Sequence, residues 1–163
     1  LSDTGELFFF FFAGLVSLDS SKTQAVVGRF GEETTELSQV RFAGEVPLAG
    51  ILILTSLDGL PIKKSKHLAL TALARAENTG TAYNTTRTVL RSAGSAPIQM
   101  EPVRGRIFLK KNGRNFPEIF AVDFQGERDR MISLNDRENE FEISLGEGFL
   151  YEILFPDTAA SAA

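Results

Sequence analysis

The chain has 163 residues, 43% hydrophobic and 23% charged, which is the size and composition of one soluble globular domain with a substantial core. The 17 basic and 21 acidic side chains give a net charge of -4, which offers no attractive field to a polyanion, so we expect no nucleic-acid partner. The absence of cysteine excludes disulfides, thiolate metal sites and a cysteine nucleophile.

The longest apolar run, residues 7–16, is about half the roughly 20 residues that a membrane-spanning helix needs. Asp3 and Glu6 precede it where a signal peptide would be basic. We therefore expect no membrane segment. Because the chain begins at Leu1 rather than at methionine, we interpret it as a fragment, preceded in the complete product by an export signal or a catalytic domain.

The first hundred residues are rich in predicted strands separated by Gly, Asp and Pro. A spacing of about ten residues is typical of a β-sandwich or barrel rather than of alternating strands and helices. The candidate strands are 6–12, 15–18, 25–30, 35–42 and 50–57.

Five consecutive phenylalanines place large apolar rings on both faces of the first predicted strand, so both faces must be covered. Phe8, Phe10 and Phe12 are therefore candidate interface residues. One interpretation is a central or interdomain strand packed against a neighbouring layer. The other is an association surface for a partner or a second copy, because such a patch in water would invite aggregation.

Residues 62–77 contain conflicting signals. Lys, Ala and Leu favour a helix, and residues 78–80 would end it. Against a helix, Leu68, Leu70 and Ala72 alternate with their neighbours at the period of a strand. We assign a strand here, an assignment that the family resemblance described below also implies.

The last third carries the strongest strand pattern. Residues 140–145 alternate polar and apolar side chains, and we expect them to pair with 149–155 as a hairpin around the turn 146–148. Asn112-Gly113 suits a type I′ hairpin turn, in which both central residues take positive φ. The other short strands expected here are 106–110, 119–124 and 130–134.

These elements predict an all-β protein: an antiparallel β-sandwich-like domain with a C-terminal meander. A composition shift near residues 92–97 separates an N-terminal β-sheet portion, 1–100, from a small C-terminal meander or sandwich portion, 101–156. We expect the two to pack as one composite unit, since the second portion buries little by itself. Residues 157–163 have nothing large to bury, and we expect a disordered tail.

No catalytic, metal-binding or cofactor-binding residue is assigned. His67 is the only histidine, and the chain contains neither a G-x-S-x-G motif nor a Gly-rich phosphate loop. Paired carboxylates are harder to judge, because a glycosidase pair need not be close in sequence. We interpret the acidic residues at turns and on polar strand faces as solvated: Asp123, Glu127, Asp129, Asp136, Glu138, Glu140 and Glu142.

A set of short motifs runs in a specific order through residues 55–84. The motifs are Thr55-Ser56-Leu57-Asp58-Gly59, Pro61, Ser65-Lys66, Leu70-Thr71-Ala72, Arg75-Ala76, Asn78-Thr79-Gly80 and Tyr83-Asn84. Flanking segments 2–6, 19–25 and 101–105 follow the same order. Together they resemble the C-terminal β-rich accessory domain that follows the (β/α)8 barrel in many bacterial glycoside-hydrolase-like proteins. The resemblance implies that the barrel is the partner, that it holds the catalytic acids, and that the protein is secreted, to an extracellular or periplasmic location.

Two polar groups within these motifs are candidate sites. Tyr83, with Asn78, Asn84 and Arg87, combines an aromatic ring with hydrogen-bonding side chains in a predicted loop, either as a ligand site for polysaccharide or as a loop that satisfies its own backbone. The absence of Trp argues against a strong sugar-binding platform.

Arg75 and Glu77 are predicted to share a strand face, either as an interface ion pair toward the barrel or as a solvated pair. The primary hypothesis from the sequence is a non-catalytic accessory domain that supports the barrel and contributes to the rim of its cleft. A carbohydrate-binding module and a structural or assembly subunit are the alternatives.

Overall fold

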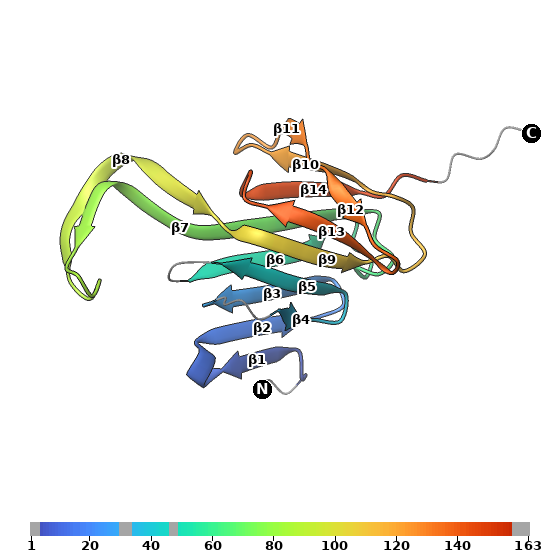
Figure 1. Ribbon diagram of the computed structural model, residues 1–163, viewed down its shortest axis with the longest axis horizontal. Coiled ribbons are helices and arrows are strands. Elements are labelled where there is room, and N and C mark those ends of the chain that lie inside the picture. The colour runs from blue at the N-terminus through green and yellow to red at the C-terminus, as the bar shows by residue number, and fades with distance from the viewer. Residues whose placement is uncertain (1–3, 30–33, 46–48, 158–163) are drawn as a thin grey trace, which may run out of the picture.

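A computed structural model describes residues 4–29, 34–45 and 49–157 of the chain, and it confirms an all-β, sandwich-like fold of two antiparallel sheets (Figure 1). In order of pairing, the large sheet contains β1 (Leu7–Phe10), β2 (Leu15–Asp19), β3 (Thr23–Gly28), β6 (Gly50–Ser56), β7 (His67–Tyr83), β14 (Leu150–Leu154), β10 (Glu118–Val122) and β11 (Arg128–Met131), and β8 (Leu90–Pro102) pairs with β7. The small sheet contains β12 (Leu134–Asp136), β13 (Glu140–Leu145), β9 (Arg104–Lys110), β5 (Val40–Glu45) and β4 (Thr35–Glu36). A short 3-10 helix, η1 (Phe11–Ala13), follows β1, and no helix in the described ranges is long and apolar enough to cross a bilayer.

The core lies between the two sheets and follows from the period of two in their strands. Every second residue of the central strands is apolar and points inward, so the two inner faces fill one continuous core. Each large side chain buried in this way stabilises the fold by roughly 1.5–3 kcal/mol. The fully buried members with the largest side chains include Leu52, Leu54, Leu68, Leu70, Ile107, Leu109, Phe141, Ile143, Tyr151 and Ile153.

The structure confirms a strand, not a helix, from His67 onward. β7 pairs with β6 on one side and with β14 on the other, and Leu68, Leu70 and Ala72 are fully buried at alternate positions. Hydrogen bonds to the neighbouring strands satisfy the backbone N–H and C=O groups of β7. Together with the burial of its apolar face, they outweigh the helical propensity of Ala and Leu. Residues 62–66 form the preceding loop, in which Ile62 is buried against the core.

The expected hairpin between 140–145 and 149–155 is wrong. β13 pairs with β9 and β12 in the small sheet, whereas β14 pairs with β7 and β10 in the large sheet. The connecting turn crosses the end of the sandwich, and there the Tyr151 hydroxyl accepts from the Gly146 and Gly148 N–H groups and donates to the Gly148 carbonyl. The apolar faces of the two strands thus meet across the core instead of lying side by side.

The Asn112-Gly113 turn has the predicted backbone, with φ of 51° and 73°, but it does not close a hairpin. It follows β9 in the small sheet and leads toward β10 in the large sheet. A favourable turn dipeptide fixes the local backbone conformation, whereas the strands on either side pair according to the core that they fill.

The phenylalanine strand is shorter than predicted and is not central. β1 ends at Phe10, because η1 follows and Gly14 closes it with a φ of 62°. β1 is an edge strand of the large sheet and pairs with β2 alone among the described strands.

β7 and β8 run well past the rest of the sandwich as a curved two-stranded arm (Figure 1). The small-residue stretch 92–97 lies within β8. Both sheets draw strands from both predicted portions, 1–100 and 101–156. In the predicted tail, residues 158–163 lie outside the described residues.

Candidate functional site

The outer face of the large sheet is apolar across its central strands. The strand register aligns Val16 with Val27, Ile51 and Leu73 in one row. A second row runs from Leu18 past the buried Ala25 to Ile53, Thr71 and Leu150. These side chains alternate with core residues and therefore point away from the core. We call these eight residues the apolar outer face; Val27 is exposed and the others are half-buried.

The outer face of the small sheet is charged instead. The Arg41 guanidinium donates to both Glu140 carboxylate oxygens, at 3.2 and 2.7 Å. Arg106 donates to Glu142 at 3.2 Å, and Arg137 donates to the same carboxylate. Arg41 also lies 4.2 Å from the centre of the Phe108 ring. The side chains on this face are mostly charged, as is usual for a sheet face in contact with water.

The two outer faces therefore suit different surroundings. An antiparallel sheet with one face in water normally alternates apolar and polar residues, as the small sheet does. In the large sheet, both the inner and the outer residues of β6 are apolar, from Ile51 to Leu54. A contiguous apolar surface of this kind marks an interaction site. The large sheet thus has a second apolar face in addition to the one that lines the core.

A polar cluster lies at one end of the same outer face. Glu152 of β14 contacts the His67 Nε2 atom at 2.7 Å and accepts from Arg128 Nε at 2.6 Å. The Arg128 guanidinium lies 4.6 Å from the centre of the Phe120 ring. The hydrogen bond from Arg128 lowers the pKa of Glu152 more than burial raises it. The carboxylate is therefore held ionised and paired, the opposite of what a general acid requires.

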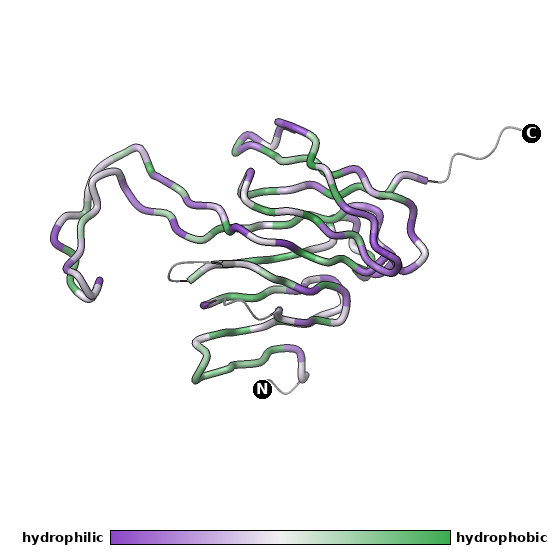
Figure 2. The backbone as a smooth tube through the Cα atoms, in the orientation of Figure 1, coloured by the Kyte–Doolittle hydropathy of each residue, from purple (hydrophilic) through white to green (hydrophobic). Residues whose placement is uncertain are grey.

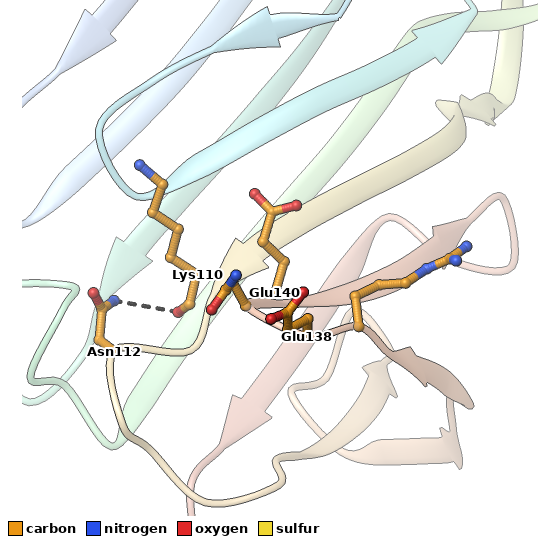
Figure 3. A pocket seen from close by; sticks show the side chains of 6 residues that line it. Lys110, Asn112, Glu138 and Glu140 are labelled. Carbon is orange, nitrogen blue, oxygen red and sulfur yellow. Dashed lines mark hydrogen bonds between the residues drawn. The ribbon is translucent and has the colours of Figure 1, made fainter.

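A polar hollow of about 560 Å³ lies where the end of β9 meets the turn before β13 (Figure 3). Its two acidic residues, Glu138 and Glu140, are not an unpaired couple, because Glu140 is bound by Arg41. The hydrogen bond from Arg41 holds the pKa of Glu140 below its ordinary 4.5. Asn112 donates to the Lys110 carbonyl at 3.2 Å and so supports the turn. The described residues contain no group of three metal-ligating side chains, here or elsewhere.

The predicted ligand residues Asn78, Tyr83, Asn84 and Arg87 all lie on the arm. Arg87 lies over the Tyr83 ring, 4.3 Å from its centre, and its Nη2 donates to Glu77. The Asn78 amide donates to the Ala93 carbonyl at 3.1 Å. One face of the aromatic ring is thus already occupied by a cation.

Asn84 organises the turn at the tip of the arm. Its Oδ1 accepts from the backbone N–H groups of Thr88 and Val89, at 2.8 and 3.1 Å. Its amide donates to the hydroxyls of Thr86 and Thr88. These bonds are those of a loop that satisfies its own backbone. A hollow of about 370 Å³ remains beside Tyr83, lined also by Leu90 and Ile98.

Arg75 and Glu77 bind different partners rather than each other. Arg75 Nε lies 3.3 Å from Glu101, directly across the β7–β8 pair, and Glu77 binds Arg87. Both are therefore ion pairs within the arm, the first across the strand pair and the second between β7 and the turn at the tip. Their predicted role at an interface with a barrel stays a prediction.

Phe8, Phe10 and Phe12 form no buried layer in the described chain. All three are exposed, together with Phe9 and Phe11. Among the described phenylalanines, three are buried: Phe42, Phe141 and Phe155.

Sequence reasoning missed the apolar outer face. Its signal was present in residues 51–54, where four consecutive apolar side chains break the alternation expected of a half-buried strand. Comparison with protein-family models, with curated proteins and with solved structures found no match.

Proposed function

We propose that this chain is a non-catalytic accessory β-domain of a bacterial, secreted glycoside-hydrolase-like protein, and that its apolar outer face packs against the catalytic (β/α)8 barrel. The observation that carries the proposal is the contrast between the two outer faces: rows of Val, Ile and Leu on the large sheet, and Arg–Glu pairs on the small sheet. Sheets and helices are stabilised in layers, and the outer helices of a barrel supply the missing layer.

The electrostatics of the described carboxyl groups support a role outside catalysis. Glycoside hydrolysis needs one carboxylic acid with a raised pKa. Hydrogen bonds instead lower the pKa of Asp58, Glu140, Glu142 and Glu152. For Asp58, burial works against ionisation but is outweighed by hydrogen bonds, foremost from the Lys66 N–H and the Ser56 hydroxyl.

The arm gives the proposal a second element. It extends beyond the two sheets (Figure 1), and most of the side chains of β8 are exposed. Placed beside a barrel, an arm of this length would form part of the rim of the substrate cleft. Tyr83, beside the turn at the tip of the arm, is then the aromatic residue closest to a bound polysaccharide.

The test uses the barrel and this domain co-expressed as separate chains, once the complete reading frame is known. Ile53→Glu places a charge in the middle of the apolar outer face and should abolish co-purification with the barrel. Ser144→Glu places the same charge on the exposed outer face of the small sheet and should leave co-purification unchanged.

Equal binding by both variants, or a reading frame without barrel-like βαβ units, would overturn the proposal. A carbohydrate-binding module predicts a different pattern: the isolated domain would be retained on an immobilised polysaccharide, and Tyr83→Ala would release it. Retention of that kind without barrel docking would favour the binding module.

A further inference from the structure

The hollow beside Tyr83 combines apolar side chains with polar groups on one side of the arm. It encloses about 370 Å³, and its lining includes Glu77, Asn78, Thr81, Tyr83, Leu90 and Ile98. We call it the arm hollow. Figure 2 shows hydrophilic and hydrophobic positions interspersed along the arm. A lining of this mixed kind suits a ligand that has both an apolar face and polar edges.

The strand pairing of the arm gathers these residues on one face. Asn78 lies directly opposite Ile98, and Tyr83 lies opposite Leu90, so each polar or aromatic side chain has an apolar neighbour across the pair. Asn78 and Thr81 are three positions apart and would lie on opposite faces of a regular strand. The register of β7 and β8 shifts just after Asn78, and both side chains line the arm hollow.

The polar groups of the arm hollow are available as acceptors. The Asn78 amide and the Thr81 hydroxyl donate to the same carbonyl, that of Ala93, each at 3.1 Å. Their donors are thus committed, which leaves the Asn78 Oδ1 and the lone pairs of the Thr81 oxygen to accept. The Glu77 Oε1 accepts from Arg87, and a carboxylate has further acceptor positions. The arm hollow therefore fits a ligand whose polar groups donate, as hydroxyls do.

Tyr83 adds an aromatic surface. The Arg87 guanidinium covers one face of the ring, 4.3 Å from its centre, but Arg87 is not part of the lining, so the ring meets the arm hollow with its remaining surface. A sugar ring has C–H groups that pack on an aromatic ring and hydroxyls at its rim that form hydrogen bonds. Glu77 carries the one charge in the described lining, and its negative sign disfavours an acidic sugar.

The hollow at the end of β9 does not offer this combination. It is lined by Lys110, Asn112, Arg137, Glu138, Asn139 and Glu140, none of which has an aromatic ring or a wholly apolar side chain. Its volume of about 560 Å³ is the larger of the two. The chemistry of the lining, and not its size, therefore distinguishes the arm hollow.

We propose that the arm hollow binds one neutral sugar unit of a polysaccharide. The C–H groups of the sugar pack on Tyr83 and Leu90, and its hydroxyls donate to Glu77, Asn78 and Thr81. The volume lies at the low end of the roughly 300–1,000 Å³ of small-ligand sites, which suits a single ring. The inference rests on the proposed function for the position of the arm at the rim of a cleft, where this site would hold one unit of the substrate chain.

One sugar ring buries little area, so we expect a millimolar Kd for the chain alone. Amide spectra of the complete 163-residue chain, labelled with ¹⁵N, measure it during titration with glucose, galactose, mannose and their disaccharides. At least one of these probes should give saturable shifts confined to the arm. Glucuronate and galacturonate differ from glucose and galactose by a carboxylate, and each should bind more weakly than its neutral counterpart.

Two variants, each with a matched control, test the lining. Thr81→Val should raise Kd about 5-fold, because an acceptor is lost. Thr79→Val removes a similar bond, from a hydroxyl to the Pro97 carbonyl, but lies outside the lining and should leave Kd unchanged. Tyr83→Ala should raise Kd about 10-fold, whereas Val89→Ala, an exposed residue outside the lining, should not.

The proposal is overturned if no neutral probe shifts the arm signals, if Thr81→Val and Thr79→Val have equal effects, or if the acidic sugars bind more tightly. Shifts of the same signals when the chain is concentrated without sugar would show a second copy in the arm hollow, and would overturn it too. Ile53→Glu should leave the sugar shifts unchanged, and Thr81→Val should leave co-purification with the barrel unchanged. Failure of the sugar site and failure of barrel docking are therefore distinguishable.

Discussion

The guanidinium of Arg114 lies 4.0 Å from the centre of the Phe155 ring, at the end of the sandwich where loops from both sheets meet. Among the residues that the structure describes, no carboxylate pairs with it. Instead it donates to the carbonyls of Ile62 at 2.9 Å, Ser65 at 3.3 Å, Lys110 at 2.8 Å and Lys111 at 3.2 Å. Burial lowers its pKa to about 10, so it remains charged at neutral pH. One side chain thus joins the 62–66 loop, the end of β9 and the segment after β14.

Arg114→Met should lower the free energy of unfolding by about 2–4 kcal/mol, because the carbonyls of buried Ile62 and Ser65 lose their charged donor. Urea unfolding at pH 7 measures the change. Arg91→Met, at an exposed position on the arm, is the control and should stay within about 0.5 kcal/mol of the original protein. Equal effects from the two substitutions would show that Arg114 does not hold the loops together.

Acid should destabilise the protein through its paired glutamates. Hydrogen bonds from Arg137 and Arg106 outweigh burial and hold the pKa of Glu142 below its ordinary 4.5, and Arg41 does the same for Glu140. A carboxyl whose pKa is lowered by folding contributes stability above its unfolded pKa, and this stability is lost as the pH falls through the folded value. The free energy of unfolding should therefore decline from about pH 5 downward.

Urea midpoints measured between neutral pH and about pH 3 follow this decline. Glu142→Gln should lower the free energy of unfolding at neutral pH. It should also make the decline of that free energy in acid less steep, because the carboxylate that titrates is gone. Glu138→Gln, at an exposed position, should change neither. If the free energy of unfolding declines equally steeply in acid in both variants, Glu142 is not a source of the decline.

Gly105 allows β5 and β9 to approach closely. Its φ is 147°, and a Cβ there would lie 2.3 Å from the Ala43 carbonyl oxygen and 2.4 Å from the Gly44 Cα. Gly105→Ala should therefore lower the free energy of unfolding by more than about 3 kcal/mol. Gly126→Ala, with a φ of 90° and open space around it, should cost about 1 kcal/mol from backbone strain alone. Similar melting temperatures for the two variants would refute a close-approach role for Gly105.

The arm should be dispensable for folding. Ala76 and Met100 are paired, so an Asn-Gly turn can replace residues 77–99 and close the shortened hairpin. We expect the shortened chain to unfold cooperatively, with a free energy of unfolding within about 1 kcal/mol of the original. Most of the removed side chains are exposed, and an isolated hairpin is only marginally stable. Loss of cooperative unfolding would mean that the arm belongs to the folding core.

The candidate surfaces were predictable to different degrees. The sequence predicted one strand with rings on both faces for the five phenylalanines, but only Phe8, Phe9 and Phe10 lie in β1, and their exposure follows from the place of β1 at the edge of the sheet. The Arg75–Glu101 pair was not predictable, since it depends on the register between β7 and β8, and the Arg87–Glu77 pair depends on the turn at the tip of the arm. The apolar outer face needed the alignment of several strands, which no single segment contains.

The class of the fold and the inward face of each strand could be predicted from the amino-acid sequence, because alternate side chains of a strand point to opposite sides. The pattern Phe141, Ile143, Leu145 therefore identified core residues correctly. It did not identify the sheet to which each strand belongs. Ladder hydrogen bonds are made by backbone groups that are the same in every residue, so the choice of neighbour depends on which side chains fill the space between the layers. For this reason β13 and β14, adjacent in the chain, belong to opposite sheets, and the exposed rows of the large sheet emerge only from the assembled fold.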